Sequence, residues 1–399
     1  MTALERRASV SLAALFALRM LGLFLILPVF AVHARGLPGG EQAALVGFAM
    51  GVYGLAQALL HLPFGLASDR FGRKPVIVAG LILFALGSLF AAQADSVAGI
   101  AIGRAIQGAG AISAAVTAFI ADSTRESQRT KAMAMVGGSI GLTFAFSLVA
   151  APALYGWIGM DGLFELTGVL ALLAIGVTLF VVPPAPLDQA GPALSRSMNL
   201  RSVAQDTDLM RLNLGVFVLH CVQMASFVVV PGWLVERAGL GLAEHWKVYL
   251  GVVLLSFLVM LPPLFWSERR GRLREIFLGA VALLLAVCVG FMSQPAGLVA
   301  MAGLLLAFFA GFNVLEASLP SLVSRLAPVG SKGAALGIYN TMQALGVFAG
   351  GALGGLLLAR WGGGAVFAVC SALLVVWLAT ASGMRRWPGR RTSQVQPGN

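Results

Sequence analysis

The chain alternates long apolar runs with short polar connections. A helix of about 20 mostly apolar residues is long enough to cross the hydrocarbon core of a bilayer, and runs of that length recur along the sequence. They cover roughly residues 9–32, 43–67, 75–94, 97–121, 130–157, 162–182, 211–235, 246–267, 274–293, 296–322, 333–358 and 363–384. This pattern predicts an all-α membrane protein with twelve transmembrane helices.

One polar connection is much longer than the others. Residues 183–208 are rich in Pro, Ser and Asp and divide the twelve predicted spans into two groups of six. We therefore predict an N-terminal six-helix half (1–182), a cytoplasmic linker (183–210), a C-terminal six-helix half (211–384) and a cytoplasmic tail (385–399).

Composition supports membrane insertion and argues against a soluble nucleic-acid-binding protein. The chain is 59% hydrophobic and 11% charged, with a mean hydropathy of +0.90, whereas soluble domains contain about 25% charged residues. The formal charge of +11 comes from cations gathered in short connections, which is typical of membrane topology and not of a nucleic-acid-binding face. The three cysteines lie far apart within apolar runs and predict neither a disulfide framework nor a metal site.

The distribution of Lys and Arg predicts the orientation of the chain. Of the 27 cations, 21 fall on one side of the predicted spans and 4 on the other, while Arg19 and Arg104 lie within helices. By the positive-inside rule both termini are expected in the cytoplasm. The first apolar run follows Arg6 and Arg7, but it is longer than the ~7–15 residues of a signal-peptide core, so we expect an uncleaved first helix.

The two predicted halves share short sequence patterns. The segment SDRFGR at 68–73 corresponds to SERRGR at 267–272, and TKAMAM at 130–135 corresponds to SKGAAL at 331–336. The separations, 199 and 201 positions, are nearly equal. Parallel repeats of this kind are common in secondary transporters, which place the binding site between the repeats near the membrane midplane.

Several segments resemble the major facilitator superfamily. Residues 65–74, GLASDRFGRK, resemble its motif A, and residues 103–110, GRAIQGAG, resemble motif B of the proton-coupled members. The segments LRMLGLF, GVYGLAQALLHLPFGLASDRFGRKP and AEHWKVYL are similar to the bacterial YajR branch. The resemblance implies the fold of that superfamily, with two halves related by pseudo-two-fold symmetry, in a bacterial inner membrane, and activity like that of drug:proton antiporters.

The sequence also departs from that pattern in two places. Span 5 carries Ala151-Pro152 where motif C of drug:proton antiporters has Gly-Pro. Members of the YajR branch often carry a soluble C-terminal domain, but this chain ends about 15 residues after its last predicted span. We therefore expect that domain to be absent.

The charged segment around motif A predicts a conformational latch. Gly65 would allow a close helix approach, Gly72 a tight turn, and Asp69 would cap or face a helix end. Arg73 could bridge Asp69 to Asp122, at the end of the fourth span. The resemblance implies that such a cluster holds the halves together against the start of the eleventh helix. The predicted latch comprises Gly65, Asp69, Arg70, Gly72, Arg73 and Asp122. The alternative is that its cations only fix topology and bind anionic lipid.

Four ionisable side chains lie well inside predicted spans, where a charge costs about 2.5–3.5 kcal/mol. They are Arg19, Arg104, His220 and Glu316, on spans 1, 4, 7 and 10, and the resemblance implies that these helices line a central cavity. We predict proton coupling by Glu316, with His220 and Arg104. Arg19 would pair with Glu316, attract an anionic substrate group or hold helices together. The predicted substrate cavity comprises Arg19, Tyr53, Gln57, Gln107, Gln223, Asn313, Asn340 and Gln343.

No motif in the sequence indicates an enzyme. Walker loops, zinc-ligand spacings and nucleophile elbows are absent, so we expect no cofactor and energy drawn from an ion gradient. The leading hypothesis is a monomeric proton-coupled antiporter that exports a small amphipathic molecule by alternating access. An importer or uniporter of a small polar or anionic metabolite is the first alternative. A membrane scaffold or sensor without flux is the second.

Overall fold

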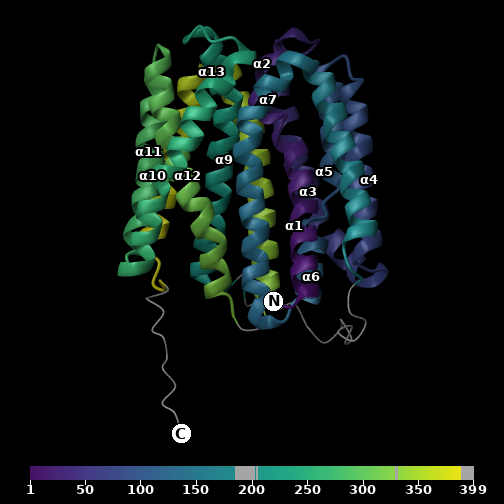
Figure 1. Cartoon of the computed structure of the whole chain (residues 1–399). Coiled ribbons are helices and arrows are strands. Elements are labelled where there is room, and N and C mark those ends of the chain that lie inside the picture. The colour runs from purple at the N-terminus through teal and green to yellow at the C-terminus, as the bar shows by residue number, and fades with distance from the viewer. Residues whose placement is uncertain (185–202, 204, 329–330, 388–399) are drawn as a thin grey trace.

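The computed structural model describes residues 1–184, 203, 205–328 and 331–387, and these form helices without any β-strand (Figure 1). Much of the predicted linker and most of the predicted tail lie outside these residues. In chain order the α-helices are α1 (Ala3–Phe24), α2 (Leu27–His33), α3 (Ala43–Phe71), α4 (Arg73–Ala92), α5 (Val97–Ala109), α6 (Ser113–Ser123), α7 (Glu126–Gly176), α9 (Thr207–Glu236), α10 (His245–Arg270), α11 (Leu273–Met292), α12 (Leu298–Leu326) and α13 (Lys332–Ser382). Within the described residues, ten helical segments are long and apolar enough to span a membrane.

Two of these segments, α7 and α13, contain 51 residues each. A straight helix of that length would measure about 76 Å, far more than the hydrocarbon core of a bilayer, about 30 Å. Each is broken at one glycine with positive φ: Gly159 (φ 68°, ψ −170°) and Gly362 (φ 78°, ψ 175°). Glycine adopts this backbone conformation without the steric cost that a side chain would add. Each long segment therefore has two arms, one on either side of its glycine.

The helices form one elongated bundle with the N-terminus and the end of α13 at the same end (Figure 1). We call this the terminal end and the opposite one the distal end. We also call α1–α7 the N-terminal half and α9–α13 the C-terminal half. Gly156, close to the break in α7, lies against Ala243 in the connection between α9 and α10, so the break in α7 belongs to the distal end.

The first and fourth predicted spans differ from single straight helices. The first begins at Ala3, six residues before the predicted boundary, because Thr2 and Glu5 form a reciprocal capping box. The fourth is divided into α5 and α6 at Gly110. Gly110 packs so closely on Gly80 of α4 that a Cβ would collide with the Gly80 carbonyl oxygen. The break also frees the Gly110 carbonyl for a partner outside its own helix.

The two halves contact each other through glycines on α3 and α13. A Cβ added to Gly47 would lie 2.6 Å from the Cα of Gly355, and one added to Gly351 would lie 2.6 Å from the carbonyl oxygen of Gly47. We call Gly47, Gly51, Gly351 and Gly355 the glycine seam. Gly350, on another face of α13, packs against the backbone of Cys221 on α9. Glycines therefore allow α13 to approach both α3 and α9 closely.

We expect Gly47→Val to destabilise the protein, because both partners at this contact are backbone atoms that cannot rotate away. Forcing additional atoms into a packed contact typically costs about 1–3 kcal/mol. Gly279→Val on α11 is the matched control, since no atom lies within 4 Å of a Cβ at that position. Thermal unfolding of the purified proteins in detergent should show a lower midpoint for Gly47→Val alone. Equal midpoints for the two variants would contradict close backbone packing at the glycine seam.

Candidate functional site

The C-terminal half holds a carboxylate beside an imidazole. Glu316 Oε2 on α12 lies 3.6 Å from His220 Nε2 on α9. His220 Nδ1 is 3.0 Å from the Val216 carbonyl oxygen, and Gln343 Nε2 is 2.7 Å from His220 Nε2. Because a carbonyl oxygen only accepts, Nδ1 carries the hydrogen. Nε2 of the neutral ring then accepts from Gln343, and Glu316 Oε2 has no hydrogen-bond partner among the described residues.

This arrangement can store one proton. A proton placed between Glu316 and His220 would turn a contact between two acceptors into a charge-assisted hydrogen bond. The Glu316 side chain is 32% exposed whereas that of His220 is 6% exposed, so the carboxylate is the more accessible member. Phe312 contacts the His220 ring edge-on, with ring centroids 5.9 Å apart. The pair is thus accessible through its carboxylate, while Phe312 covers the imidazole.

The N-terminal half holds Arg19 on α1 with only 1% of its surface exposed. Its Nη2 donates to the Tyr53 hydroxyl at 2.6 Å and to the Gly110 carbonyl oxygen at 3.2 Å. The second bond uses the carbonyl that the break between α5 and α6 makes available. The predicted alternative of an ion pair between Arg19 and Glu316 is wrong for this conformation, because Glu316 pairs with His220 instead.

Arg104 on α5 is also 1% exposed and lies close to the same tyrosine. Its Nη2 donates to the Met50 carbonyl oxygen at 3.2 Å, and its guanidinium carbon is 5.3 Å from the Tyr53 ring centroid. The corresponding distance from Arg19 is 5.9 Å. Both arginines thus lie next to Tyr53. Arg104 bonds within its own half. Among the described residues it forms no ion pair with Glu316.

The remaining residues predicted to line the substrate cavity lie in several different environments. Gln107 is buried and donates to Ser88, and Asn313 donates to Ser256; each therefore bonds inside its own half. Gln223 lines a small internal cavity beside Tyr249 and Phe309. Gln57 and Asn340 are half-buried. Gln343 contacts His220. Of the predicted polar set, only Tyr53 and Gln343 contact the buried ionisable groups in the described structure.

The motif A residues form a charged cluster at the terminal end. Arg73 is ion-paired with Asp69 and donates from Nε to Asp122 Oδ2 at 2.8 Å. The predicted bridge from Asp69 through Arg73 to Asp122 is therefore present, and Gly72 has the positive φ expected of a tight turn. All of its members belong to the N-terminal half. The first residues of α13, where the resemblance placed the latch contact, have no side-chain cap.

Two expectations for this segment are wrong in the described conformation. Asp69 does not cap a helix: it lies in the last turn of α3, and no side chain caps α4. A Cβ on Gly65 would lie 3.5 Å from the Ala114 Cβ, which is an ordinary contact and not a close helix approach. Arg70 is exposed, with its guanidinium carbon 5.3 Å from the Phe71 ring centroid.

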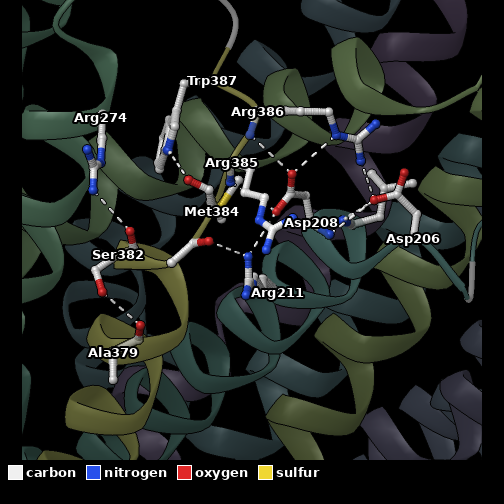
Figure 2. Close-up of polar contacts among 12 residues, drawn as sticks. Asp206, Asp208, Arg211, Arg274, Ala379, Ser382, Met384, Arg385, Arg386 and Trp387 are labelled. Atoms are coloured by element: carbon white, nitrogen blue, oxygen red, sulfur yellow. Dashed lines mark hydrogen bonds and ion pairs between the residues drawn. The ribbon is translucent and has the colours of Figure 1, made fainter.

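The terminal end carries a second charged cluster in the C-terminal half (Figure 2). Asp208 accepts from Arg211 and from Arg386, and Asp206 is ion-paired with Arg386. This cluster ties the start of α9 to the segment after α13. Hydrogen bonding to Asp206 raises the pKa of Arg386, so that cation stays charged. As with motif A, its ion pairs stay within one half.

The distal end contains an ion pair between the halves that the sequence analysis missed. Arg35, after α2, pairs with Glu236 at the end of α9. The two residues are 201 positions apart, which is the separation of the internal repeat. The sequence therefore contained a signal for this contact: two loops at equivalent positions of the repeat lie next to each other when both are beside the symmetry axis.

An aromatic cluster joins the halves below that ion pair, and it was also missed. Phe144 on α7 is its centre. The Phe144 ring centroid lies 5.1 Å from that of Phe24 on α1, 6.3 Å from that of Phe227 on α9 and 6.0 Å from that of Phe312 on α12. Among the described ion pairs, those at the terminal end stay within a half, while Arg35–Glu236 crosses between halves. The halves are thus closed on each other at the distal end.

We expect Glu236→Gln to loosen this closure only slightly. The two side chains are 44% and 50% exposed, and exposed ion pairs contribute about 0–1 kcal/mol, or at most about a fivefold change in population. The measurement is the alkylation rate of a cysteine at Val228, buried beside the pair, in a background without native cysteines. Glu41→Gln, which removes a neighbouring exposed acid, is the control. A change above tenfold would show that this pair, and not the seam or the aromatic cluster, holds the distal end.

Sequence comparisons place this arrangement among known transporters. Residues 10–351 match the sequence model of the Major Facilitator Superfamily. The chain is 43% identical to the inner membrane transport protein YajR of Escherichia coli (strain K12), over 97% of this chain and 85% of that protein. It is 28% identical to the multidrug resistance protein MdtH of Aeromonas hydrophila subsp. hydrophila, over 85% of this chain and 84% of that protein.

The fold is shared with solved transporter structures. A bacterial homologue of the human lysosomal transporter Spinster superimposes with a TM-score of 0.76 at 14% sequence identity. The superposition covers 97% of this chain and 99% of that structure. At this level of identity the similarity concerns the fold alone.

Proposed function

Because this chain belongs to the Major Facilitator Superfamily, whose members are secondary transporters and not enzymes, we propose that it exports a small amphipathic molecule in exchange for protons. The chain is a multi-pass membrane protein related to an inner membrane transport protein. Export is supported by the similarity to a multidrug resistance protein. Ala151-Pro152 in place of the Gly-Pro of motif C is the feature least in keeping with antiport.

We further infer twelve spans and a cytoplasmic position for both termini. Counting each arm of α7 and α13 as one crossing turns ten long apolar segments into twelve. An even number returns the chain to the side on which it began, which agrees with the N-terminus and the end of α13 lying at the same end (Figure 1). The excess of Lys and Arg in the connections at that end supports a cytoplasmic position for it.

The observation that carries proton coupling is the contact between Glu316 and His220. Their 3.6 Å separation leaves two acceptors facing each other without a shared hydrogen, and Gln343 occupies the remaining lone pair of the ring. Ionisable residues inside a bilayer commonly belong to proton or substrate pathways. A proton entering here changes the charge of a site on α9 and α12, both of which pack on helices that contact the other half.

Alternating access would exchange contacts at the two ends of the bundle. In the described conformation the distal end is closed by Arg35–Glu236, the aromatic cluster and the glycine seam. The converse state would open that end and bring Asp69 and Arg73 toward the uncapped start of α13. A carboxylate near a helix N-terminus is stabilised by the helix dipole, which gives the motif A cluster a role as the cytoplasmic latch.

The test is proton movement in proteoliposomes with a pH-sensitive dye inside. A panel of cationic, neutral and anionic compounds is added outside, without an imposed proton gradient. Proton movement that accompanies a compound, in the direction opposite to its flux, supports antiport. Movement in the same direction would replace export by proton-driven import, and compound flux without proton movement would replace coupling by uniport. Binding without any flux would support the scaffold or sensor alternative.

A further inference from the structure

Two buried arginines of the N-terminal half have no acidic partner among the described residues. A charge inside a membrane protein costs about 2.5–3.5 kcal/mol unless it is neutralised, yet Arg19 and Arg104 form no ion pair with any described carboxylate. Their partners are the Tyr53 hydroxyl and the backbone carbonyls of Gly110 and Met50. Within the described part of the chain, the Nε atom of Arg19 and the Nη1 atom of Arg104 have no hydrogen-bond partner.

A third basic group belongs to the same region. His61, on the same helix as Tyr53, is buried, and its Nε2 has no partner in the part of the chain that the structure describes. Gln107, on the same helix as Arg104, also has an unpartnered buried oxygen there. The region thus holds two fixed positive charges and several unsatisfied polar atoms, all in side chains with less than a tenth of their surface exposed. Such groups are costly to retain unless a ligand satisfies them.

A series of aromatic ring contacts connects this cationic region with the Glu316–His220 pair. Phe24 packs against the cluster that contains Tyr53 and Phe84. It also meets Phe144 edge-on, and Phe144 in turn contacts Phe312, which covers His220. The path therefore begins at two cations, continues over aromatic rings from both halves, and ends at the group proposed to exchange protons.

We propose that the transported molecule is an organic anion, with a compact acidic group such as a carboxylate and a flat apolar body. The acid would bind Arg19 and Arg104, and the body would lie on Phe24, Phe144 and Phe312. This inference rests on the proposed transport function and adds the charge class of its substrate.

The chemistry of the region fits a carboxylate well. Guanidinium groups bind carboxylates through paired, charge-assisted hydrogen bonds, and both arginines now bond only to neutral acceptors that a carboxylate can replace or supplement. Met20 lies over Arg19, with its sulfur 3.8 Å from Nη1. A methionine side chain changes rotamer readily, so movement of Met20 opens a route to the guanidinium. An inorganic anion could satisfy the charge, but only an organic one would also contact the aromatic rings.

The test compares matched acids and amides that differ in charge but hardly in size. Equilibrium binding of 2-naphthoate against 2-naphthamide, and of indole-3-acetate against indole-3-acetamide, is measured at pH 7 with the full-length protein in lipid nanodiscs. We expect at least one acid to bind at least about tenfold more tightly than its amide, the effect of about one charge-assisted hydrogen bond. Arg19→Gln and Arg104→Gln should each reduce this preference without weakening amide binding, which also reports correct folding.

Two controls keep the result specific. Arg19→Lys retains a charge and should keep part of the preference, while Arg360→Gln, an exposed residue at the distal end, should not change it. A preference that persists in both glutamine variants, or no acid preference in any pair, would overturn the proposal. Competition by sodium phosphate or chloride as strong as that by 2-naphthoate would assign the site to a free anion and would also overturn it.

This test separates the substrate class from proton coupling. Binding is measured without a proton gradient, so Glu316→Gln should keep the acid preference even where it removes proton movement. Loss of the acid preference together with intact coupling would refute the anion proposal alone. An acid preference in a protein that moves no protons would refute the proposed coupling alone.

Discussion

Glu316→Gln is expected to abolish substrate-driven proton movement while substrate exchange across the membrane continues. Glutamine has nearly the shape of glutamate but does not bind a proton in the physiological range. The amide can donate to His220 Nε2 in place of Gln343, because Nε2 lies 3.6 Å from Glu316 Oε2 in the wild-type protein. The variant therefore imitates the protonated pair permanently. Since a group in one fixed charge state can no longer link its protonation to a conformational equilibrium, the two movements are uncoupled.

The measurement follows proton movement and labelled substrate in the same proteoliposomes. Proton movement should fall at least about tenfold, which corresponds to about 1.4 kcal/mol and is well below the cost of an unpaired charge in the membrane. Glu165→Gln provides a matched control, because Glu165 is an exposed acid of the other half. If Glu316→Gln keeps wild-type proton movement, Glu316 is a structural residue and the proposed coupling group must be sought elsewhere.

Asp69→Asn is expected to stop the transport cycle without preventing membrane insertion. Asp69 is exposed and pairs with Arg73 inside the N-terminal half, so its charge adds little to the described conformation. In the opposite conformation it would face the uncapped start of α13. A charge at a helix N-terminus contributes about 0.3–2 kcal/mol. Its loss would therefore lower the population of the state open at the distal end by up to about thirtyfold.

This second prediction is checked by flux and by accessibility together. The Asp69→Asn variant should reach the membrane in normal amount, show little flux, and alkylate more slowly at a cysteine introduced at Val228. Arg70→Gln removes an exposed charge from the same segment and should have a much smaller effect, because Arg70 makes no ion pair among the described residues. Wild-type flux in Asp69→Asn would exclude a latch role for this cluster.

The sequence predicted those features that depend on composition and local pattern. Apolar run length indicated the spans, because backbone groups in lipid must be satisfied within helices. The resemblance to motif A, together with the place of Asp122 at the end of the fourth predicted span, predicted the Asp69–Arg73–Asp122 bridge. In each case the relevant physical interaction operates within or beside one segment.

What the sequence did not predict depends on how distant segments meet. The division of the fourth span at Gly110 follows from the contact with Gly80 on another helix, and no helix-breaking residue other than glycine marks it. The sequence left the partner of Arg19 open. The packing shows that Arg19 bonds to Tyr53, while Glu316 lies beside His220. The aromatic cluster around Phe144 consists of single residues from four helices, so no single segment of the sequence shows a pattern that predicts it.

The glycine seam has a consequence for how such proteins diversify. Because Gly47, Gly351 and Gly355 bring backbone against backbone, these contacts between the halves use no side chain that could be tuned to a particular cargo. The residues that we propose to bind the cargo, such as Arg19 and Phe144, lie outside the seam. Natural variation at those positions can change what is carried without altering the machinery that moves it. One ancestral mechanism can therefore give rise to transporters for chemically unrelated compounds.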